Sequence, residues 1–273
     1  MRYVRITQHL RGIMQPRRGQ QLVQSLERGL AALEMALDGS VRPSEVAEAL
    51  GIDRSTAYRL LYTLMAKGYL LQDERTREFT SNPAKFFQLY GKVATLLDWP
   101  DVAGDFLTKL RDESGETANL GVRQANNVIY IAHKPGQAAL SVNFALGTSR
   151  PLHCSALGKA LLAAQPDAVT AEWVASAPLT TYTTKTITEP SHLKRHLVTV
   201  RADGYAVDDE ETFAGVRCIA APIHDHRQQV IAALGISGPT TRITQEQLPH
   251  FAQTVMQVAA ELSAELGAPN SDL

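Results

Sequence analysis

The sequence predicts an α+β protein with an N-terminal winged helix-turn-helix, a helical linker and a larger C-terminal α/β domain. Near residue 50, two short amphipathic segments flank a glycine, and a strand-like hairpin follows them. Beyond residue 100, strand-like runs alternate with helical ones, and the length of 273 residues fits two domains. We expect a flexible basic arm over residues 1–20, the winged helix-turn-helix over 21–82, the linker helix over 83–100, the α/β domain over 101–266 and a tail over 267–273.

The first expected helix covers residues 25–38, where leucines recur every three or four positions. Such a stripe is typical of a helix that buries one face. We therefore expect this helix to supply the third side of a small core, through Leu26, Leu30, Leu33 and Leu37.

Residues 43–67 predict a helix, a tight turn and a second helix. Gly51 stands at the turn, where a left-handed backbone favours glycine, and Asp53 is placed to cap the second helix. The outer face of that helix carries hydroxyls and arginines without an acid, and these side chains bind bases and phosphates. This favours a recognition helix for double-stranded DNA over an ordinary helix pair. The expected contacts are Arg54, Ser55, Thr56, Tyr58 and Arg59.

A hairpin expected over residues 69–80 would form the wing beside the recognition helix. Its charged tip holds Arg75 and Arg77, which are placed to follow the phosphate backbone. Residues 1–82 contain 12 basic and 9 acidic side chains, whereas the remainder contains 15 and 19. A mildly basic head on an acidic body agrees with a DNA-binding module joined to another domain.

Composition narrows the class of protein. No apolar run approaches the roughly 18 residues that cross a membrane, so we expect no membrane partner. The N-terminus has no apolar segment of a secretion signal, and two cysteines do not form a disulfide framework. We therefore expect a cytoplasmic protein.

The linker is expected as a helix over residues 84–97 that breaks at Trp99–Pro100. The second domain then predicts a sheet covered by helices. Its expected strands are residues 118–123, 127–133, 139–144, 205–208, 216–223 and 230–237, and its expected helices are 101–114, 157–164, 191–203 and 245–266.

Residues 147–163 predict a polar loop that leads into a helix. The first N–H groups of a helix and its positive dipole end suit an anion such as a carboxylate. Ser155 can cap this helix, and Gly158 allows another element to approach closely. A plain capped helix start remains the alternative at this point.

These motifs, in this order, are similar to those of the isocitrate lyase regulator (IclR) family of bacterial transcription factors. The resemblance covers about residues 22–266. It rests on the winged helix-turn-helix, His-Cys-Ser-Ala-Leu-Gly-Lys at 153–159, Gly-Tyr-Ala-Val-Asp-Asp-Glu-Glu at 204–211, Gly-Val-Arg-Cys at 215–218 and Ser-Gly-Pro at 237–239. It implies a GAF-like effector-binding domain, an operator as DNA partner, and a homodimer through the DNA-binding domains or a dimer of dimers.

The resemblance also implies a small organic acid as effector and a regulator, such as a repressor, of a catabolic operon. Ser155, Ala156, Leu157 and Gly158 would hold the carboxylate. Asp208 would meet a ligand hydroxyl, Cys218 would line the floor, and Ser237 would add a hydroxyl. Gly235 replaces a serine of some relatives, which would leave room for a larger ligand. Because Phe144 and Leu146 lie near the same wall by register, together with Leu140 and Val142, we expect an aromatic acid.

Two other functions would use some of the same residues. A hydrolase would need Cys154 as nucleophile and His153 as base, but adjacent strand residues point to opposite faces, so we expect no enzyme. A metal-responsive regulator would bind a metal through His224 and His226 with Cys218 or Cys154. That segment also fits an exposed hairpin turn, and we expect neither a metal nor a cofactor.

Overall fold

The computed structural model describes residues 23–94 and 99–269, and the chain divides near residue 97 into two compact units. The expected arm over 1–20, the last residues of the expected linker helix and the end of the expected tail lie outside the described residues. No described helix is long and apolar enough to cross a membrane.

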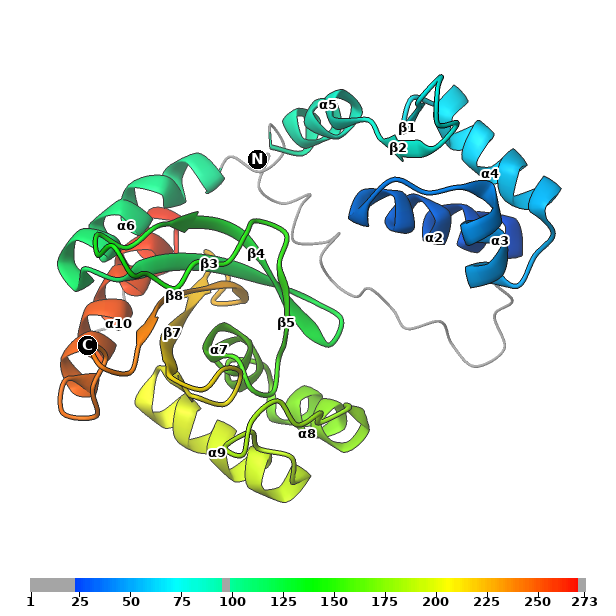
Figure 1. Ribbon diagram of the computed structural model, residues 1–273. Helices are drawn as coiled ribbons and strands as arrows, with labels where there is room; N and C mark the ends of the chain where they lie inside the picture. Colours follow the sequence, from blue (N-terminus) through cyan, green and yellow to red (C-terminus); the bar gives the residue numbers. More distant parts are fainter. Residues whose placement is uncertain (1–22, 95–98, 270–273) are drawn as a thin grey trace. The chain divides into compact units, whose positions relative to one another are not determined.

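The N-terminal unit is a winged helix-turn-helix, as the sequence predicts (Figure 1). Gly51 adopts the left-handed backbone with φ of 61° after α3, and the Asp53 carboxylate accepts the Thr56 N–H at 2.9 Å to begin α4. The hairpin pairs Leu70 with Ser81 and Gln72 with Phe79. The elements are α2 (Gln24–Asp38), α3 (Pro43–Leu50), α4 (Arg54–Ala66), β1 (Leu70–Gln72), β2 (Phe79–Ser81) and α5 (Pro83–Ala94).

Helix α2 supplies the third side of the small core, as the sequence predicts, but of its leucine stripe only Leu33 packs against that core. Ala32 and Ala36 face α4 instead and are buried, with Leu33 partly buried beside them. Small side chains allow two helices to approach closely, which turns the longer leucines away. Leu26, Leu30 and Leu37 are 61%, 52% and 50% exposed.

The second unit begins with α6 (Trp99–Ser114). Trp99 and Pro100, where the sequence predicts the end of the linker helix, form the first turn of α6. A proline is tolerated there, since its missing N–H has no partner in the first turn of a helix.

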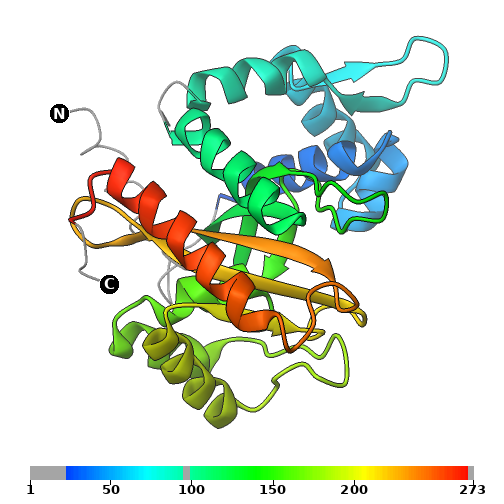
Figure 2. The same ribbon diagram turned by 90° about the vertical axis from the view of Figure 1, so that its left-hand side faces the viewer.

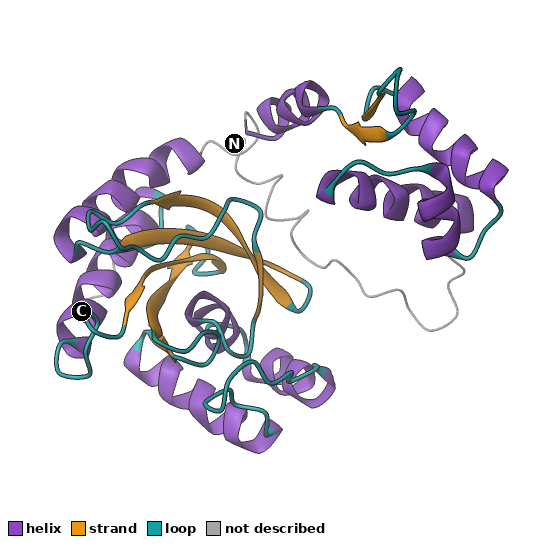
Figure 3. Cartoon of the chain, in the orientation of Figure 1, coloured by secondary structure: helices purple, strands orange, loops and turns teal. Residues whose placement is uncertain are grey.

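The second unit is a curled, six-stranded antiparallel sheet with helices on both faces (Figures 1 and 3). The strand order is β5-β4-β3-β8-β7-β6. Helix α7 packs inside the curl with α9 against it, whereas α6 and α10 cover the other face (Figure 2). The strands are β3 (Thr117–Gln124), β4 (Asn127–Lys134), β5 (Ser149–Pro151), β6 (Ala206–Asp209), β7 (Val216–His224) and β8 (Val230–Pro239); the further helices are α7 (Ala156–Ala163), α8 (Asp167–Ser176), α9 (Pro190–Asp203) and α10 (Leu248–Glu265).

One expected strand is absent from the described sheet. Residues 139–144 form an irregular loop, because the edge of β4 is occupied by residues 149–151. Side-chain bonds hold the loop, since the Asn143 side chain accepts from the Thr117 hydroxyl and donates to Ser141. Helix α8 and strand β5 were not predicted.

Candidate functional site

The outer face of α4 presents the side chains that the sequence predicts for DNA contact. Arg54, Ser55 and Arg59 are exposed, and Tyr58 is 44% exposed while stacking on Tyr62 at 6.1 Å between ring centroids. The face of α4 that packs on the core lies opposite, through Ala57 and Leu61. The helix is therefore held by its apolar face, with both arginines exposed.

The hydroxyls of Ser55 and Thr56, in the first turn of this helix, serve the cap as well as the surface. Ser55 and Thr56 donate to the Asp53 carboxylate at 2.8 and 2.6 Å. The hydrogen bonds from Thr56, first of all from its hydroxyl, hold the pKa of Asp53 well below its usual range. These hydroxyls stabilise the start of the recognition helix and retain only their oxygen lone pairs for DNA.

The tip of the hairpin is a turn ordered by Asp73. Its carboxylate accepts the N–H groups of Arg75 and Thr76 at 2.9 and 2.7 Å, and Arg77 has a left-handed φ of 63°. Both arginines are exposed, as a wing requires. Sequence reasoning missed Arg42, which lies just before α3. Its side chain pairs with Glu78 of the hairpin at 2.7 Å.

In the second unit, a row of polar residues crosses four neighbouring strands on the face that α7 covers. Thr117 of β3 lies opposite Ser237 of β8, Ser237 opposite Cys218 of β7, and Cys218 opposite Asp208 of β6. All four are buried. The structure thus brings together three predicted residues, Asp208, Cys218 and Ser237, from distant parts of the sequence.

The next row contains Asn119, which the sequence did not single out although it alternates with Thr117 along β3. Its amide donates to the Ser237 hydroxyl at 3.1 Å, and its Oδ1 is buried without a partner among the described residues. Gly235 lies opposite Asn119. A Cβ at Gly235 would overlap the Ile219 carbonyl, so tight strand packing explains this glycine.

Helix α7 begins above this face and carries the predicted carboxylate loop. The Ser155 hydroxyl accepts the Gly158 N–H at 3.3 Å and donates to the Pro151 carbonyl at 2.7 Å. A Cβ at Gly158 would lie 2.5 Å from the Leu152 Cα, so only glycine fits. The expected residues 155–158 are all buried, and the first N–H groups of a helix have no partner within it.

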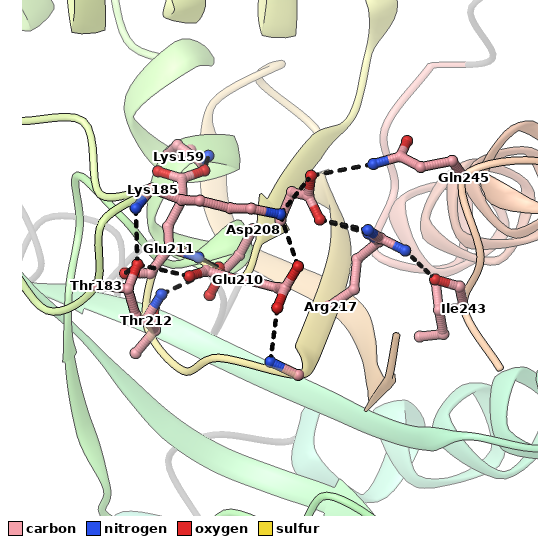
Figure 4. Close-up of polar contacts among 12 residues, drawn as sticks. Lys159, Thr183, Lys185, Asp208, Glu210, Glu211, Thr212, Arg217, Ile243 and Gln245 are labelled. Carbon is pink, nitrogen blue, oxygen red and sulfur yellow. Dashed lines mark hydrogen bonds and ion pairs between the residues drawn. The ribbon is translucent and has the colours of Figure 1, made fainter. Parts of the chain in front are cut away.

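The acidic block at 208–211 divides its carboxylates between two environments (Figure 4). Asp209 pairs with Arg217, and Glu210 pairs with Lys185 at 2.6 Å. Asp208 instead accepts the N–H groups of Glu211 and Thr212 at 2.7 and 3.2 Å, and Glu211 pairs with the fully buried Lys159.

Burial raises the pKa of both inward-facing acids. The pKa of Asp208 lies above its usual range, and that of Glu211 rises to about 7 although Lys159 opposes the shift. Burial also raises the pKa of Cys154 to about 12 and raises the pKa of Cys218, so both thiols keep their protons at neutral pH. The two thiols therefore offer uncharged polar groups to a ligand.

Aromatic residues border the same face. Tyr130 lies 5.0 Å from Phe144 and Phe144 lies 6.3 Å from Phe213, measured between ring centroids. The Arg150 guanidinium lies against Phe144 and Phe213. The predicted Leu146 is 59% exposed and does not join the buried cluster.

The alternative sites do not assemble among residues 23–94 and 99–269. The ring Nε2 of His153 lies 3.0 Å from the Thr180 carbonyl, and the only side chain bonded to the Cys154 thiol in this part of the chain is Thr212. The segment of His224 and His226 forms a hairpin turn closed by Asp225. No group of three potential metal ligands gathers among the residues searched.

Two family models match the chain. The IclR helix-turn-helix domain matches residues 25–74, and the C-terminal domain of the bacterial transcriptional regulator IclR matches residues 92–264. The second match alone spans more than half of the chain.

Individual relatives agree with these models. The transcriptional regulator BhcR of Paracoccus denitrificans is 33% identical over 253 residues, which cover 92% of this chain and 89% of that protein. The crystal structure of Thermotoga maritima IclR is 29% identical with a TM-score of 0.71 and covers 90% of this chain and 100% of that one. An IclR homologue from Microbacterium hydrocarbonoxydans, complexed with 4-hydroxybenzoate, is 24% identical with a TM-score of 0.75 over 89% and 98% of the two chains.

Proposed function

The chain belongs to the IclR family of DNA-binding transcriptional regulators, which are not enzymes, and we propose that a small aromatic carboxylic acid controls its operator binding. In this proposal the acid binds on the sheet face under α7. The operator is bound by α4 and the hairpin tip, through Arg54, Ser55, Thr56, Tyr58, Arg59, Arg75 and Arg77.

One observation carries the effector proposal. Among the described residues, six buried side-chain atoms have no hydrogen-bond partner, and three of these belong to the candidate site: Asn119 Oδ1, Arg150 Nε and Glu211 Oε2. Folded proteins satisfy nearly all buried polar groups, and the exceptions need an explanation. A polar ligand that bonds these groups supplies one.

The aromatic class follows from the rings that border the site. Phe144 and Tyr130 are buried beside the polar row, and Phe213 is 41% exposed at its edge. An aromatic ring packs well against such neighbours, while the polar row and the start of α7 accept its polar groups. The Microbacterium homologue, which has the same fold, binds 4-hydroxybenzoate. We place Asp208 and Asn119 at the ligand's hydroxyl, and α7 residues 155–158 at its carboxylate.

The proposal includes a homodimer formed through the DNA-binding units. Helix α2 exposes a narrow apolar stripe consisting of Val23, Leu26, Leu30 and Leu37. A stripe at helical spacing that no described part of its own unit covers suits the same face of a second copy. Two recognition helices would then read two half-sites about one helical turn apart, or a multiple of it.

The test is calorimetry of the purified chain with benzoate, 4-hydroxybenzoate, pyruvate and succinate, followed by gel shift on a DNA fragment from upstream of its own gene. We expect the aromatic acids to bind and to change the affinity for the fragment. A catabolic operon for such an acid would be the regulated target. The absence of both heat and any shift in DNA affinity with all four acids would refute the organic-acid proposal.

A further inference from the structure

Arg150 is a cation on the same sheet face as the candidate effector site. It lies opposite Val128 across β4 and β5. Cross-strand partners project from the same face of a sheet. Val128 belongs to the buried cluster around α7, together with Tyr130 and Phe144. The guanidinium therefore lies on the α7 side of the sheet, and it is close enough to Cys218 of the polar row for its charge to oppose the rise in the pKa of that thiol.

The guanidinium contacts aromatic rings and, among the described residues, no acid. Its Cζ lies 5.3 Å from the Phe144 ring centroid and 4.9 Å from that of Phe213, and the two rings are nearly parallel, at 23°. Its Nε is buried and unbonded within the part of the chain that the structure describes. No ion pair there includes Arg150.

The two inward-facing acids have other partners. Glu211 pairs with Lys159, and Asp208 accepts two backbone N–H groups. A guanidinium that has lost water from a buried N–H needs an acceptor, and its planar fork matches a carboxylate with two parallel hydrogen bonds. The missing partner is therefore best supplied by a ligand that carries an anionic, planar group.

Arg150 also lies next to the start of α7. It directly precedes Pro151, and the Pro151 carbonyl accepts the Ser155 hydroxyl at 2.7 Å, which folds the chain back at this point. The ring faces of Phe144 and Phe213 hold the guanidinium in place through cation–π contacts. A cation and the positive end of a helix thus adjoin one another.

We propose that Arg150 binds the effector carboxylate by a two-point hydrogen bond, so that the site selects aromatic carboxylates over uncharged analogues. This inference rests on the proposed effector function and assigns its specificity-determining residue. The N–H groups at the start of α7 assist on the same carboxylate. The flanking rings contribute the aromatic surface on which the ligand ring packs.

The experiment is calorimetry on the full-length chain with benzoate and 4-hydroxybenzoate and with the matching amides, benzamide and 4-hydroxybenzamide. The variants are Arg150→Met, which keeps an unbranched apolar stem, and Arg150→Lys, which keeps the charge but loses the planar fork. Arg195→Met on the exposed surface of α9 is the matched control. Thermal unfolding of each variant without ligand provides a second readout.

We expect Arg150→Met to weaken binding of the acids at least about thirtyfold, to change amide binding much less, and to leave the melting temperature near or above that of the wild type. Arg150→Lys should bind the acids with an affinity between those of the wild type and Arg150→Met. Arg195→Met should bind them as the wild type does. If the acids bind the wild type and Arg150→Met equally, Arg150 is not the carboxylate partner although the effector function stands. If Arg150→Met melts several degrees lower with unchanged acid binding, its role is structural. If neither acid binds the wild type, the proposed function fails together with this inference.

Discussion

At the residue scale, the arginines of α4 allow a direct test of DNA recognition. Arg54 and Arg59 are exposed and form no described ion pair that a substitution would break. We expect Arg54→Ala or Arg59→Ala to weaken operator binding by about 1–3 kcal/mol, because each loses a base or phosphate contact. Gel-shift titration at fixed salt measures this, with Arg195→Ala on α9 as the control. If both variants bind the operator with wild-type affinity, α4 does not bind in the DNA groove.

The contributions of Glu211 and its neighbour Glu210 to folding stability should change with pH in opposite directions. Burial raises the pKa of Glu211 from 4.5 to about 7. Between these values the folded state keeps a proton that the unfolded state loses, so the contribution of Glu211 to stability falls as pH rises through this window. We expect the wild type to lose on the order of 3 kcal/mol relative to Glu211→Gln between pH 4.5 and 7.

Glu210→Gln is the matched control. Lys185 lowers the pKa of Glu210, so its contribution is present above the unfolded pKa of 4.5 and is lost as pH falls through the lower folded value. Urea unfolding across this pH range measures both variants. Curves for Glu211→Gln that run parallel to the wild type would show that Glu211 titrates normally and that the burial argument is wrong.

At the element scale, the leucine stripe of α2 predicts the oligomeric state. We expect Leu26→Ser combined with Leu30→Ser to convert a dimer to monomers, because the substitutions remove apolar surface from the shared interface. Val198→Ser replaces an equally exposed apolar residue of α9 and should have no effect. Light scattering gives the mass of the particle in solution. In footprinting, the protected DNA should shrink from two half-sites to one. A monomeric wild type, or an unaffected double variant, contradicts this.

Local sequence patterns predicted most elements because their caps and turns are encoded locally. Gly51 and Asp53 predicted the turn and the start of α4, and the strands expected over 118–123 and 216–223 correspond to β3 and β7. The spacing of leucines in α2 predicted the helix but not its buried face, since apolar spacing is the same whether a stripe meets the core or a partner. The prediction of a strand over residues 139–144 was wrong because long-range pairing decides which segment forms the edge strand.

The site was only partly predictable for the same reason. Motif resemblance placed Asp208, Cys218 and Ser237 in one site, and the sheet register agrees. Asn119 and Arg150 were not singled out, and Glu211 was seen only as part of the acidic motif, because the feature that marks all three is a buried polar atom left without a partner by tertiary packing. Leu146 was misjudged from strand register in a segment that is a loop.

At the scale of the whole molecule, the account requires a free-energy coupling between two sites in different units. An acid alters DNA binding only if its affinity differs between DNA-competent and DNA-incompetent states. Couplings of this kind are typically about 1–3 kcal/mol, and they are reciprocal. The acid must then bind more weakly, or more tightly, when operator is present, by the same factor by which it changes operator affinity.

The decisive measurement is therefore a closed thermodynamic cycle with 4-hydroxybenzoate and the operator fragment. Calorimetry gives the affinity for the acid with and without saturating operator, and gel shift gives the operator affinity with and without saturating acid. The account predicts two equal ratios of roughly fivefold to 150-fold. An acid that binds the free protein but has the same affinity in the presence of operator would contradict control of DNA binding by this ligand.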